Sequence, residues 1–278
     1  MDAYQIQILS CPICGYAVYL IWEEKNYRVF RCKRCGVHFY KDGNTAFLYD
    51  EIYFYRWYIR SFQKRKRYLK KLLSRIEKYI KLPKGNYLDI GCGIGIFLDI
   101  AKENLWSATG IDVSPAAIAY CKKKNFNVMC GNLVQLGLPS QAFDVVVLFD
   151  VIAHLNNPSD YMKEIKRIIK DKGFLIIKTP RRSLLLFYIA RFLKFTKKSR
   201  VLLHIPAQIF HFNERSLKNF CVLNGFDVMD IFTIDDLPAF LLNTAAMNVL
   251  LFFLHSFLKI FCGRDSMVVI CKKKLSTE

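Results

Sequence analysis

The sequence is poor in acidic residues. Asp and Glu together number 23 against 42 Lys and Arg, which leaves a formal net charge of +19 at pH 7. A surface of this charge fits an anionic partner, and nucleic acid, an acidic membrane face and anionic glycans suit it equally. The shortage of acids alone chooses none of these partners, because part of such an excess can arise without any partner.

Internal repeats, low-complexity tracts and a secretion signal are also missing from the sequence. The N-terminus, MDAYQIQILS, lacks a charged-then-apolar pattern and does not suggest export. Ten cysteines, four of them in two C-x-x-C pairs and the rest scattered, fit a reducing compartment, so we expect a cytoplasmic protein. A hydrophobic share of 53%, with 15% aromatic residues, argues against disorder. At 278 residues the chain has room for one well-cored domain with a small appendage, but hardly for two full domains.

The composition changes along the chain and predicts three regions. Residues 1–45 are punctuated by Cys and Gly and are typical of small hairpins. Residues 46–84 form a basic helical linker or cap, which Pro83 and Gly85 are expected to end. Residues 85–278 alternate strand-like and helical runs, which indicates βαβ units and an α/β fold with a doubly wound parallel sheet.

The stretch DIGCGIGIF places Gly91, Gly93 and Gly95 between a predicted strand and a predicted helix. The free N–H groups of that helix would face a ligand in the crevice. The spacing is G-x-G-x-G and lacks the sixth-place glycine of a dinucleotide fingerprint. Asp112 closes the next strand and is placed to accept hydrogen bonds from both ribose hydroxyls of a nucleoside. The pattern therefore predicts a nucleoside cofactor.

Four motifs in order, YLDIGCGIGIFL, GIDVSP, FDVVVLFDVIAHLNNP and EIKRIIKDKGFLIIKTP, resemble the class I S-adenosylmethionine-dependent methyltransferases over residues 86–180. The resemblance implies a Rossmann-like seven-stranded sheet whose last strand, from GRDSMVVICKKK, is antiparallel. It implies S-adenosylmethionine as the cofactor, held at the methionine end, the ribose and the adenine rim. The residues assigned to it are Asp89, Gly91, Cys92, Gly93, Gly95, Asp112, Val113, Asn132 and Leu133.

Outside these motifs the resemblance continues with departures. The segment HIPAQIFHFNERSLKNFCVLNGF looks like the substrate-side part of bacterial methyltransferases found among cell-surface glycan genes. Members often have His where Gln208 stands and usually Glu where Ala153 stands, so acid, base or metal roles do not carry over there. Tyr49, Tyr53 and Tyr55 match a segment that can cover the cofactor in similar proteins, although such aromatics often simply become buried.

The predicted chemistry is in-line attack on the methyl group of a sulfonium, for which alignment and exclusion of water matter most. An oxygen nucleophile usually needs a base, and His154, just beyond the fourth strand, could take its proton. His154 could equally cap the next turn or pack under the cofactor. Asp150 and His211 are further catalytic candidates, and the role of Asp150 is similarly ambiguous.

Two C-x-x-C pairs near the N-terminus, Cys11 with Cys14 and Cys32 with Cys35, are each followed by glycine. Their separation falls within the pattern of zinc ribbons. Four thiolates leave no open coordination position, so the predicted zinc is structural. Two disulfides are disfavoured in a reducing compartment, and redox-active pairs would need a thioredoxin-like βαβ context that is absent here.

Two apolar insertions, 180–206 and 237–262, interrupt the last part of the predicted domain. The second is long enough to suggest a membrane span, but Asn248, His255 and Lys259 fall on one helical stripe and the flanking strands must share a compartment, so we reject a span. Both could be buried helices or a dimer interface. They could also dip into an anionic bilayer at the inner membrane face and bring the enzyme to a lipid-linked acceptor.

The sequence thus supports three functions. The leading hypothesis is O-methylation of a saccharide, a lipid-linked glycan or a small-molecule acceptor. The second is rRNA base methylation, suggested by the zinc ribbon and the basic helix but disfavoured because no N/D-P-P-Y/F tetrapeptide follows the fourth strand. The third is a non-catalytic zinc-ribbon binding protein with a degenerate methyltransferase core, which the Ala153 departure makes conceivable.

Overall fold

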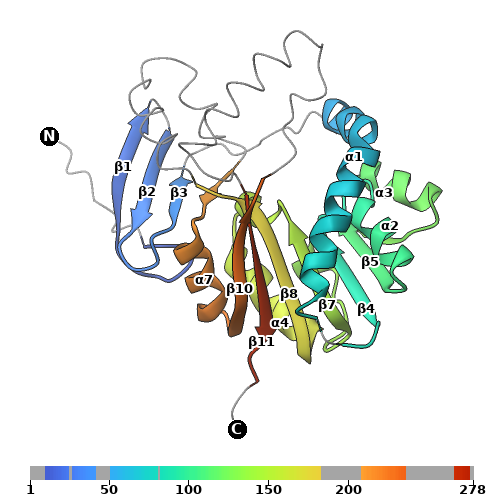
Figure 1. The fold of residues 1–278 in the computed structure, drawn as a ribbon. Coiled ribbons are helices and arrows are strands. Elements are labelled where there is room, and N and C mark those ends of the chain that lie inside the picture. The colour runs from blue at the N-terminus through green and yellow to red at the C-terminus, as the bar shows by residue number, and fades with distance from the viewer. Residues whose placement is uncertain are drawn as a thin grey trace, which may run out of the picture.

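The protein is described by a computed structural model that places residues 10–24, 27–41, 51–80, 82–182, 208–235 and 266–275. Two sheets organise this part of the chain (Figure 1). The strands of the larger sheet are β4 (Asn86–Ile90), β5 (Ser107–Asp112), β6 (Asn127–Cys130), β7 (Phe143–Phe149), β8 (Ile169–Pro180), β10 (Phe226–Ile234) and β11 (Ser266–Lys273). The strands of the smaller sheet are β1 (Val18–Glu24), β2 (Tyr27–Cys32), β3 (His38–Lys41) and β9 (Phe210–His211).

The larger sheet has seven strands in the order β10-β11-β8-β7-β4-β5-β6. Strands β8, β7, β4, β5 and β6 are parallel, and β11 lies antiparallel between β8 and β10. The central strands β4, β7 and β8 are almost continuously buried because helices cover both faces. The predicted seven-stranded sheet with an antiparallel last strand is confirmed.

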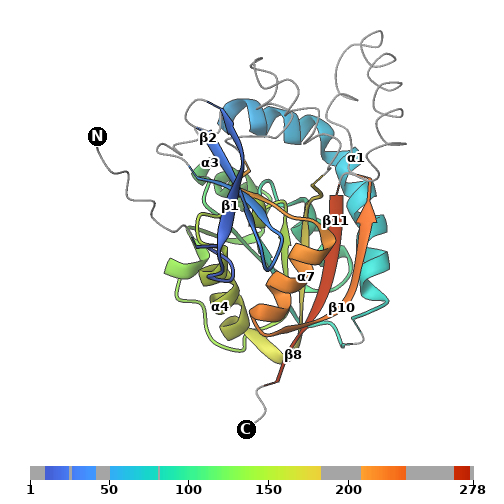
Figure 2. The same cartoon turned by 90° about the vertical axis from the view of Figure 1, so that its left-hand side faces the viewer.

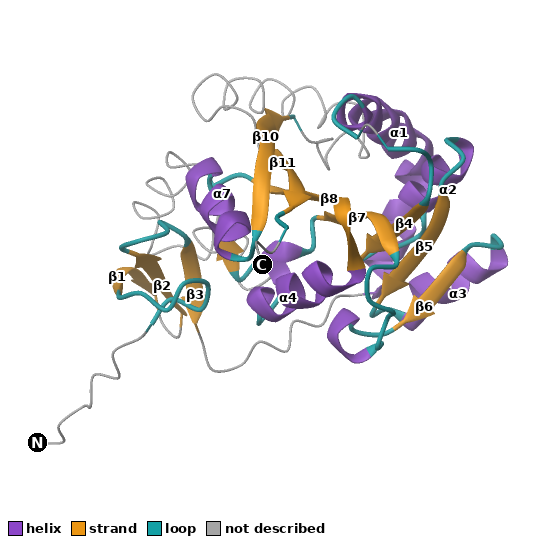
Figure 3. Ribbon diagram, turned by 90° about the horizontal axis from the view of Figure 1, so that it is seen from below, coloured by secondary structure: helices purple, strands orange, loops and turns teal. Residues whose placement is uncertain are grey.

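Helices cover the two faces of the larger sheet (Figure 3). On one side lie α1 (Glu51–Glu77), α2 (Ile96–Glu103) and α3 (Pro115–Lys123), and on the other α4 (Pro158–Ile168) and α7 (Glu214–Leu223). The 3-10 helices η1 (Leu133–Gln135) and η2 (Ile152–His154) follow β6 and β7. Helix α4 shows why these segments pack as they do, because Tyr161, Met162, Ile165 and Ile168 form one buried stripe.

Helix α1 confirms the predicted basic helix but ends differently. It stops at Glu77, well before Pro83, so neither Pro83 nor Gly85 ends it. The N–H of Tyr79 turns back to the carbonyl of Ile76 at 2.9 Å, and the Tyr79 hydroxyl donates to Asp230 of β10 at 2.6 Å. The chain leaves the helix axis here because Tyr79 is anchored on the sheet.

The smaller sheet is completed by a strand from far along the chain. Strand β3 pairs antiparallel with β9, with His38 opposite His211 and Phe39 opposite Phe210. Figures 1 and 2 show this sheet beside α7, and Figure 1 shows it at the end of the molecule away from α2. Cys11 and Phe39 belong to the same buried apolar cluster as Phe210 and as β7 and β8 residues. The cysteine-rich hairpins therefore share a core with the larger sheet.

Several predicted features lie outside the described residues. These are Tyr49 and residues 183–206 and 237–262 of the two apolar insertions. Among the helices that the structure does describe, none combines the length and the apolar character needed to cross a membrane.

Candidate functional site

A cavity of about 470 Å³ lies at the carboxyl ends of β4, β5 and β7. Strand β4 lies between β5 and β7, so the strand order reverses here, which is where α/β sheets bind ligands. The volume falls within the usual range for small-molecule sites.

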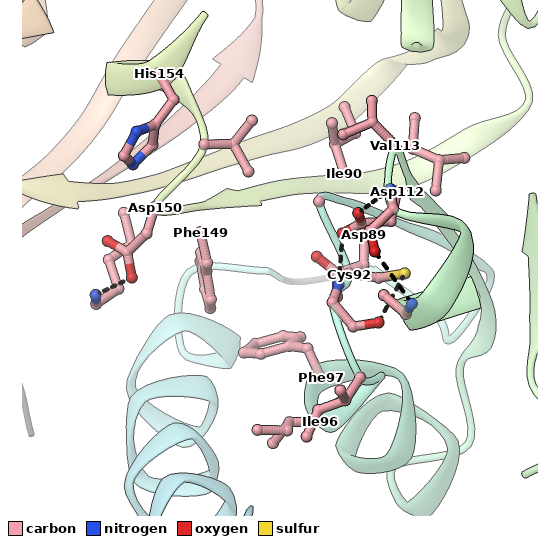
Figure 4. Close-up of a pocket in the computed structure, with 18 of the residues that line it drawn as sticks. Asp89, Ile90, Cys92, Ile96, Phe97, Asp112, Val113, Phe149, Asp150 and His154 are labelled. Carbon is pink, nitrogen blue, oxygen red and sulfur yellow. Dashed lines mark hydrogen bonds and ion pairs between the residues drawn. The ribbon is translucent and has the colours of Figure 1, made fainter. Parts of the chain in front are cut away.

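The cavity has two sides (Figure 4). Asp89, Cys92, Asp112 and Val113 gather on one side, which we call the cofactor half. His154 and Asp150 lie on the opposite side, which we call the acceptor half. Phe97 and Phe149 lie between them, with ring centroids 4.5 Å apart in an edge-to-face contact. The arrangement separates a ligand-holding loop from a group of titratable side chains.

The cofactor half is built on the glycine loop between β4 and α2. Gly91 has a φ of +76°, and a Cβ there would overlap a methyl group of Val151, so only glycine fits. The Gly93 N–H donates to Asp112 Oδ2 at 2.8 Å, and the Ser114 N–H donates to Asp112 Oδ1 at 2.9 Å. Each carboxylate oxygen keeps further acceptor capacity, so Asp112 can shape the loop and also accept from ribose hydroxyls.

Asp89 lies beneath this loop and is 3% exposed. Burial, and then the negative charge of Asp112, raises the pKa of the Asp89 carboxyl to about 8. No ion pair joins Asp89 to a lysine, arginine or histidine anywhere in the described ranges. A cationic ligand group would therefore offset the cost of ionising this buried carboxyl. The α-ammonium of S-adenosylmethionine is such a group and fits this position.

Two predicted cofactor residues do not line the cavity. Gly95 caps α2, and a Cβ there would meet ring carbons of Phe126 at 2.9 Å and Cys121 Sγ at 3.1 Å. It therefore allows α2 to pack closely against its neighbours. Asn132 caps η1, its side chain accepting the Val134 N–H at 3.0 Å. The remaining predicted cofactor residues all line the cavity: Asp89, Gly91, Cys92, Gly93, Asp112, Val113 and Leu133.

The acceptor half contains a buried ion pair that sequence reasoning missed. Lys178, 2% exposed at the end of β8, donates to Asp150 Oδ2 at 2.6 Å. The Asp150 N–H also donates to the Lys178 carbonyl at 2.9 Å. Asp150 has a φ of +59°, which non-glycine residues seldom adopt. Both side chains line the cavity, so the strained turn holds a carboxylate and an ammonium at its wall.

His154 lies on the same wall, in η2, whereas His211 lies elsewhere. His211 is in β9 of the smaller sheet, opposite His38. Burial, and then the positive charges of Arg182 and His211, lowers the pKa of His38 to about 2, so His38 is neutral at physiological pH. The structure thus brings His154 and Asp150 together and places His211 away from them.

Helix α1 also contributes to the cavity wall. Arg65, Tyr68 and Leu69 line the cavity, a position that the sequence did not predict for any of them. Lys66 forms ion pairs with Asp99 and Glu103 of α2, which fixes α1 against the helix that follows the glycine loop. Tyr53 and Tyr55 fall in α1 as predicted, but their side chains lie outside the described residues.

The four N-terminal cysteines form one cluster. Their Sγ atoms all lie within 4.8 Å of one another, with 3.7 Å between Cys11 and Cys35 and 3.4 Å between Cys14 and Cys32. These distances are close to the edge of about 3.8 Å expected for a zinc–thiolate tetrahedron. The Cys35 N–H points at Cys32 Sγ, 3.4 Å away, and hydrogen bonding from Cys35 lowers the pKa of the Cys11 thiol to about 5. The cluster could hold a metal ion, and the donor set suits zinc.

The sequence of this chain is similar to those of known methyltransferases. Residues 61–231 match a protein family described as a methyltransferase domain. A probable S-adenosylmethionine-dependent methyltransferase of Mycolicibacterium smegmatis is 32% identical over 97 residues, which cover 34% of this chain and 38% of the relative. The mitochondrial ubiquinone biosynthesis O-methyltransferase of Schizosaccharomyces pombe is 31% identical over 157 residues, 52% of this chain and 56% of the relative.

A solved structure shares the fold. The crystal structure of a SAM dependent methyltransferase from Archaeoglobus fulgidus superposes with a TM-score of 0.54 and 22% identity, covering 78% of this chain and 99% of that one. This chain spans little more than a third of the M. smegmatis relative and 56% of the S. pombe relative. The family match, residues 61–231, includes most strands of the larger sheet and every residue that lines the cavity.

Proposed function

The chain belongs to the methyltransferase domain family, and on that premise we propose that it is an S-adenosylmethionine-dependent enzyme that methylates a hydroxyl oxygen of a saccharide or lipid-linked glycan acceptor. The main support for oxygen as the methylated atom is His154, which lines the same cavity as the glycine loop and could remove a hydroxyl proton. The S. pombe relative is named as an O-methyltransferase of ubiquinone biosynthesis, which supports the same target atom.

The residues of this chain divide the work between the two halves. Bound S-adenosylmethionine supplies an electrophilic methyl group. Asp112 would accept from its ribose hydroxyls, the first N–H groups of α2 would bind its carboxylate, and Asp89 would bind its ammonium. His154 takes the hydroxyl proton, and the Asp150–Lys178 pair keeps a fixed dipole at its side of the cavity. Phe97 and Phe149 keep water from the space between.

The acceptor class rests on two further features. Apolar side chains such as Leu69, Phe149 and Leu155 line the cavity, which suits an amphiphilic acceptor better than a fully hydrated one. The outer side of α1 exposes Lys64, Arg67 and Lys71 along one helical stripe, and the exposed Lys78 follows in the turn after the helix. A stripe of this charge suits the anionic surface of a membrane that carries a lipid-linked acceptor.

We also propose where the enzyme acts and which metal ion it binds. We place the enzyme in the cytoplasm, with peripheral contact at the inner membrane face. We assign one structural zinc ion to Cys11, Cys14, Cys32 and Cys35, supported by the spacing of their Sγ atoms. The apolar residues proposed for bilayer contact, near Leu185 and Phe192, and the basic residues Lys197 and Lys198 lie outside the described residues.

The experiment presents tritiated S-adenosylmethionine with three separate acceptor pools. These are alkyl glycosides together with a short-chain lipid-linked saccharide, a catechol, and total bacterial RNA. We expect label in the glycoside pool as a base-stable methyl ether. His154→Gln should lower that transfer by about 10²- to 10⁴-fold without changing S-adenosylhomocysteine affinity, because it removes the base and leaves the cofactor half intact.

Other outcomes decide between the remaining functions. Label in the catechol pool alone keeps O-methylation and overturns the saccharide acceptor. Label in RNA supports base methylation, which the exposed basic stripe of α1 would then serve. Cofactor binding with no label in any pool, under conditions where a control methyltransferase works, supports the non-catalytic binding protein.

A further inference from the structure

The smaller sheet reaches the acceptor half through the protein backbone. Ile209, directly before β9, donates its N–H to the carbonyl oxygen of Ala153 at 2.7 Å. The carbonyl oxygen of Ile209 accepts the N–H of Tyr40, in β3, at 3.1 Å. Ala153 precedes His154 in η2. Two backbone hydrogen bonds thus connect the cysteine-bearing sheet to the turn that carries the proposed base.

Both cysteine pairs make a further contact with segments that flank the acceptor half. Next to the first pair, the Ser159 hydroxyl at the start of α4 donates to the Pro12 carbonyl at 3.4 Å. Next to the second pair, the Arg182 guanidinium donates to the Gly36 carbonyl at 3.3 Å. Arg182 follows β8, the strand that carries Lys178. The segments that follow His154 and Lys178 along the chain are therefore each tied to the cysteine-bearing part of the protein.

Apolar packing fills the space behind these contacts. Val37 and Phe39 of the smaller sheet share one buried cluster with Ile152 of η2, and Leu155 packs against it. The Phe39 and Phe210 rings are 6.1 Å apart, which anchors β9 on β3. Hydrogen bonds shielded from water in this way hold their geometry better than exposed ones.

The cofactor half shares this apolar cluster through Ile90, Ile111 and Leu133, but its hydrogen bonds run elsewhere. The Gly93 N–H bonds to Asp112, the Gly91 N–H bonds to Ile111, and the Gly131 N–H bonds to the Asp112 carbonyl. Across the part of the chain that the structure describes, no hydrogen bond joins the glycine loop or Asp112 to the smaller sheet. A disturbance of the smaller sheet should therefore reach the acceptor half first.

We propose that the cysteine-bearing small sheet is a positioning element for methyl transfer, in which Ile209 holds η2, and with it His154, at the cavity wall. The proposal rests on the proposed function, because it gives His154 a catalytic task. Ile209 is a positioning residue, since it contacts the turn and not the cavity. Loosening it should move His154 and slow transfer while the cofactor binds as before.

The test compares Ile209→Pro, which lacks the N–H that Ala153 accepts, with Ile209→Val, which keeps the N–H and a β-branched side chain. The first readout is the ¹³Cε1–¹H resonance of His154 in histidine-labelled protein, assigned by its loss in His154→Gln. The second is S-adenosylhomocysteine affinity from titration calorimetry. The third is kcat with the acceptor that the three pools identify.

The proline variant should shift or broaden the His154 resonance, bind S-adenosylhomocysteine within twofold of wild type, and turn over at least tenfold more slowly. The valine variant should match wild type in all three readouts. If the proline variant does not fold, an ester at the 208–209 peptide removes the same N–H and keeps the isoleucine side chain.

Two results separate failure of this proposal from failure of the proposed function. An unchanged His154 resonance in the proline or ester variant overturns the positioning role, whatever the acceptor is. A changed resonance, in a protein whose wild type methylates no hydroxyl acceptor, supports the positioning of His154 and overturns the proposed O-methylation.

Discussion

Asp89 allows a quantitative test of the cofactor half. Its carboxyl is 3% exposed, and burial followed by the charge of Asp112 raises its pKa from 3.8 to about 8. In this range the folded protein keeps a proton that the unfolded chain releases. The free energy of unfolding should therefore fall as pH rises from about 4 to about 8. At about 1.4 kcal/mol per pH unit, the whole window amounts to roughly 5 to 6 kcal/mol.

The perturbation is Asp89→Asn, a neutral side chain of nearly the same shape. We expect wild type and variant to have similar unfolding free energies at about pH 4, because the loss in wild type develops only above the unfolded-state pKa of 3.8. At pH 9 the variant should be more stable by several kcal/mol, because it carries no buried charge. The stability that wild type loses between pH 4 and pH 9 is comparable with the total unfolding free energy of many domains.

The assay is guanidinium unfolding of the cofactor-free protein at pH 4, 7 and 9, followed by tryptophan fluorescence. Asp112→Asn is the matched control, and it should narrow the pH window because the negative charge of Asp112 is the second cause of the raised pKa. Equal unfolding free energies of wild type and Asp89→Asn at pH 9 would refute the reasoning, and with it the role assigned to Asp89.

Asp112→Ala should bind S-adenosylhomocysteine at least tenfold more weakly, since hydrogen bonds to a charged acceptor contribute about 1.5 to 3 kcal/mol each; wild-type affinity in titration calorimetry would contradict the ribose assignment. Elemental analysis should find one zinc ion per chain and none in Cys14→Ser, and iron or no metal in wild type would contradict the zinc assignment. Lys178→Met should lower the unfolding free energy by about 2 to 3 kcal/mol, less than for a fully buried pair because Asp150 is one-third exposed. Adding Asp150→Asn should restore most of that stability in chemical unfolding, and no recovery would show that the Asp150 charge is not what Lys178 neutralises.

The larger sheet and the glycine loop could be predicted from the sequence because their signals are local. The motif around Gly91 joins a buried strand to a helix within a few residues, and Asp112 closes the very next strand. The structure puts both at the cavity. The antiparallel final strand came with the family resemblance, and the sheet order confirms it.

Features that depend on tertiary contact could not be predicted in this way. Lys178 stands in an apolar strand, and nothing near it in sequence indicates that it pairs with Asp150, 28 residues earlier. Strand β9 is two residues long, too short for an alternating pattern, and only its pairing with β3 reveals it. Arg65 and Tyr68 belong to the basic helix α1, and its charge pattern gives no indication that one side of the helix lines the cavity.

The G-x-G-x-G pattern predicted cavity-lining glycines correctly at Gly91 and Gly93 but not at Gly95, again because of a tertiary contact. Gly95 follows the pattern of the loop but lies outside the cavity lining, where it makes room for the Phe126 ring. A sequence pattern can indicate that a position requires glycine, but only the three-dimensional structure shows which neighbouring side chain leaves no room for a Cβ.

The composition of the cavity wall has an evolutionary consequence. The cofactor half comes from one continuous stretch between Asp89 and Leu133, while the rest of the cavity wall draws on α1, on the turn after β7 and on the end of β8. Changes in these separate segments can accumulate without disturbing the continuous stretch. A lineage can therefore exchange one acceptor for another while inheriting the methyl-donor site unaltered, and gene segments encoding α1 or the turn after β7 are natural units for such exchange.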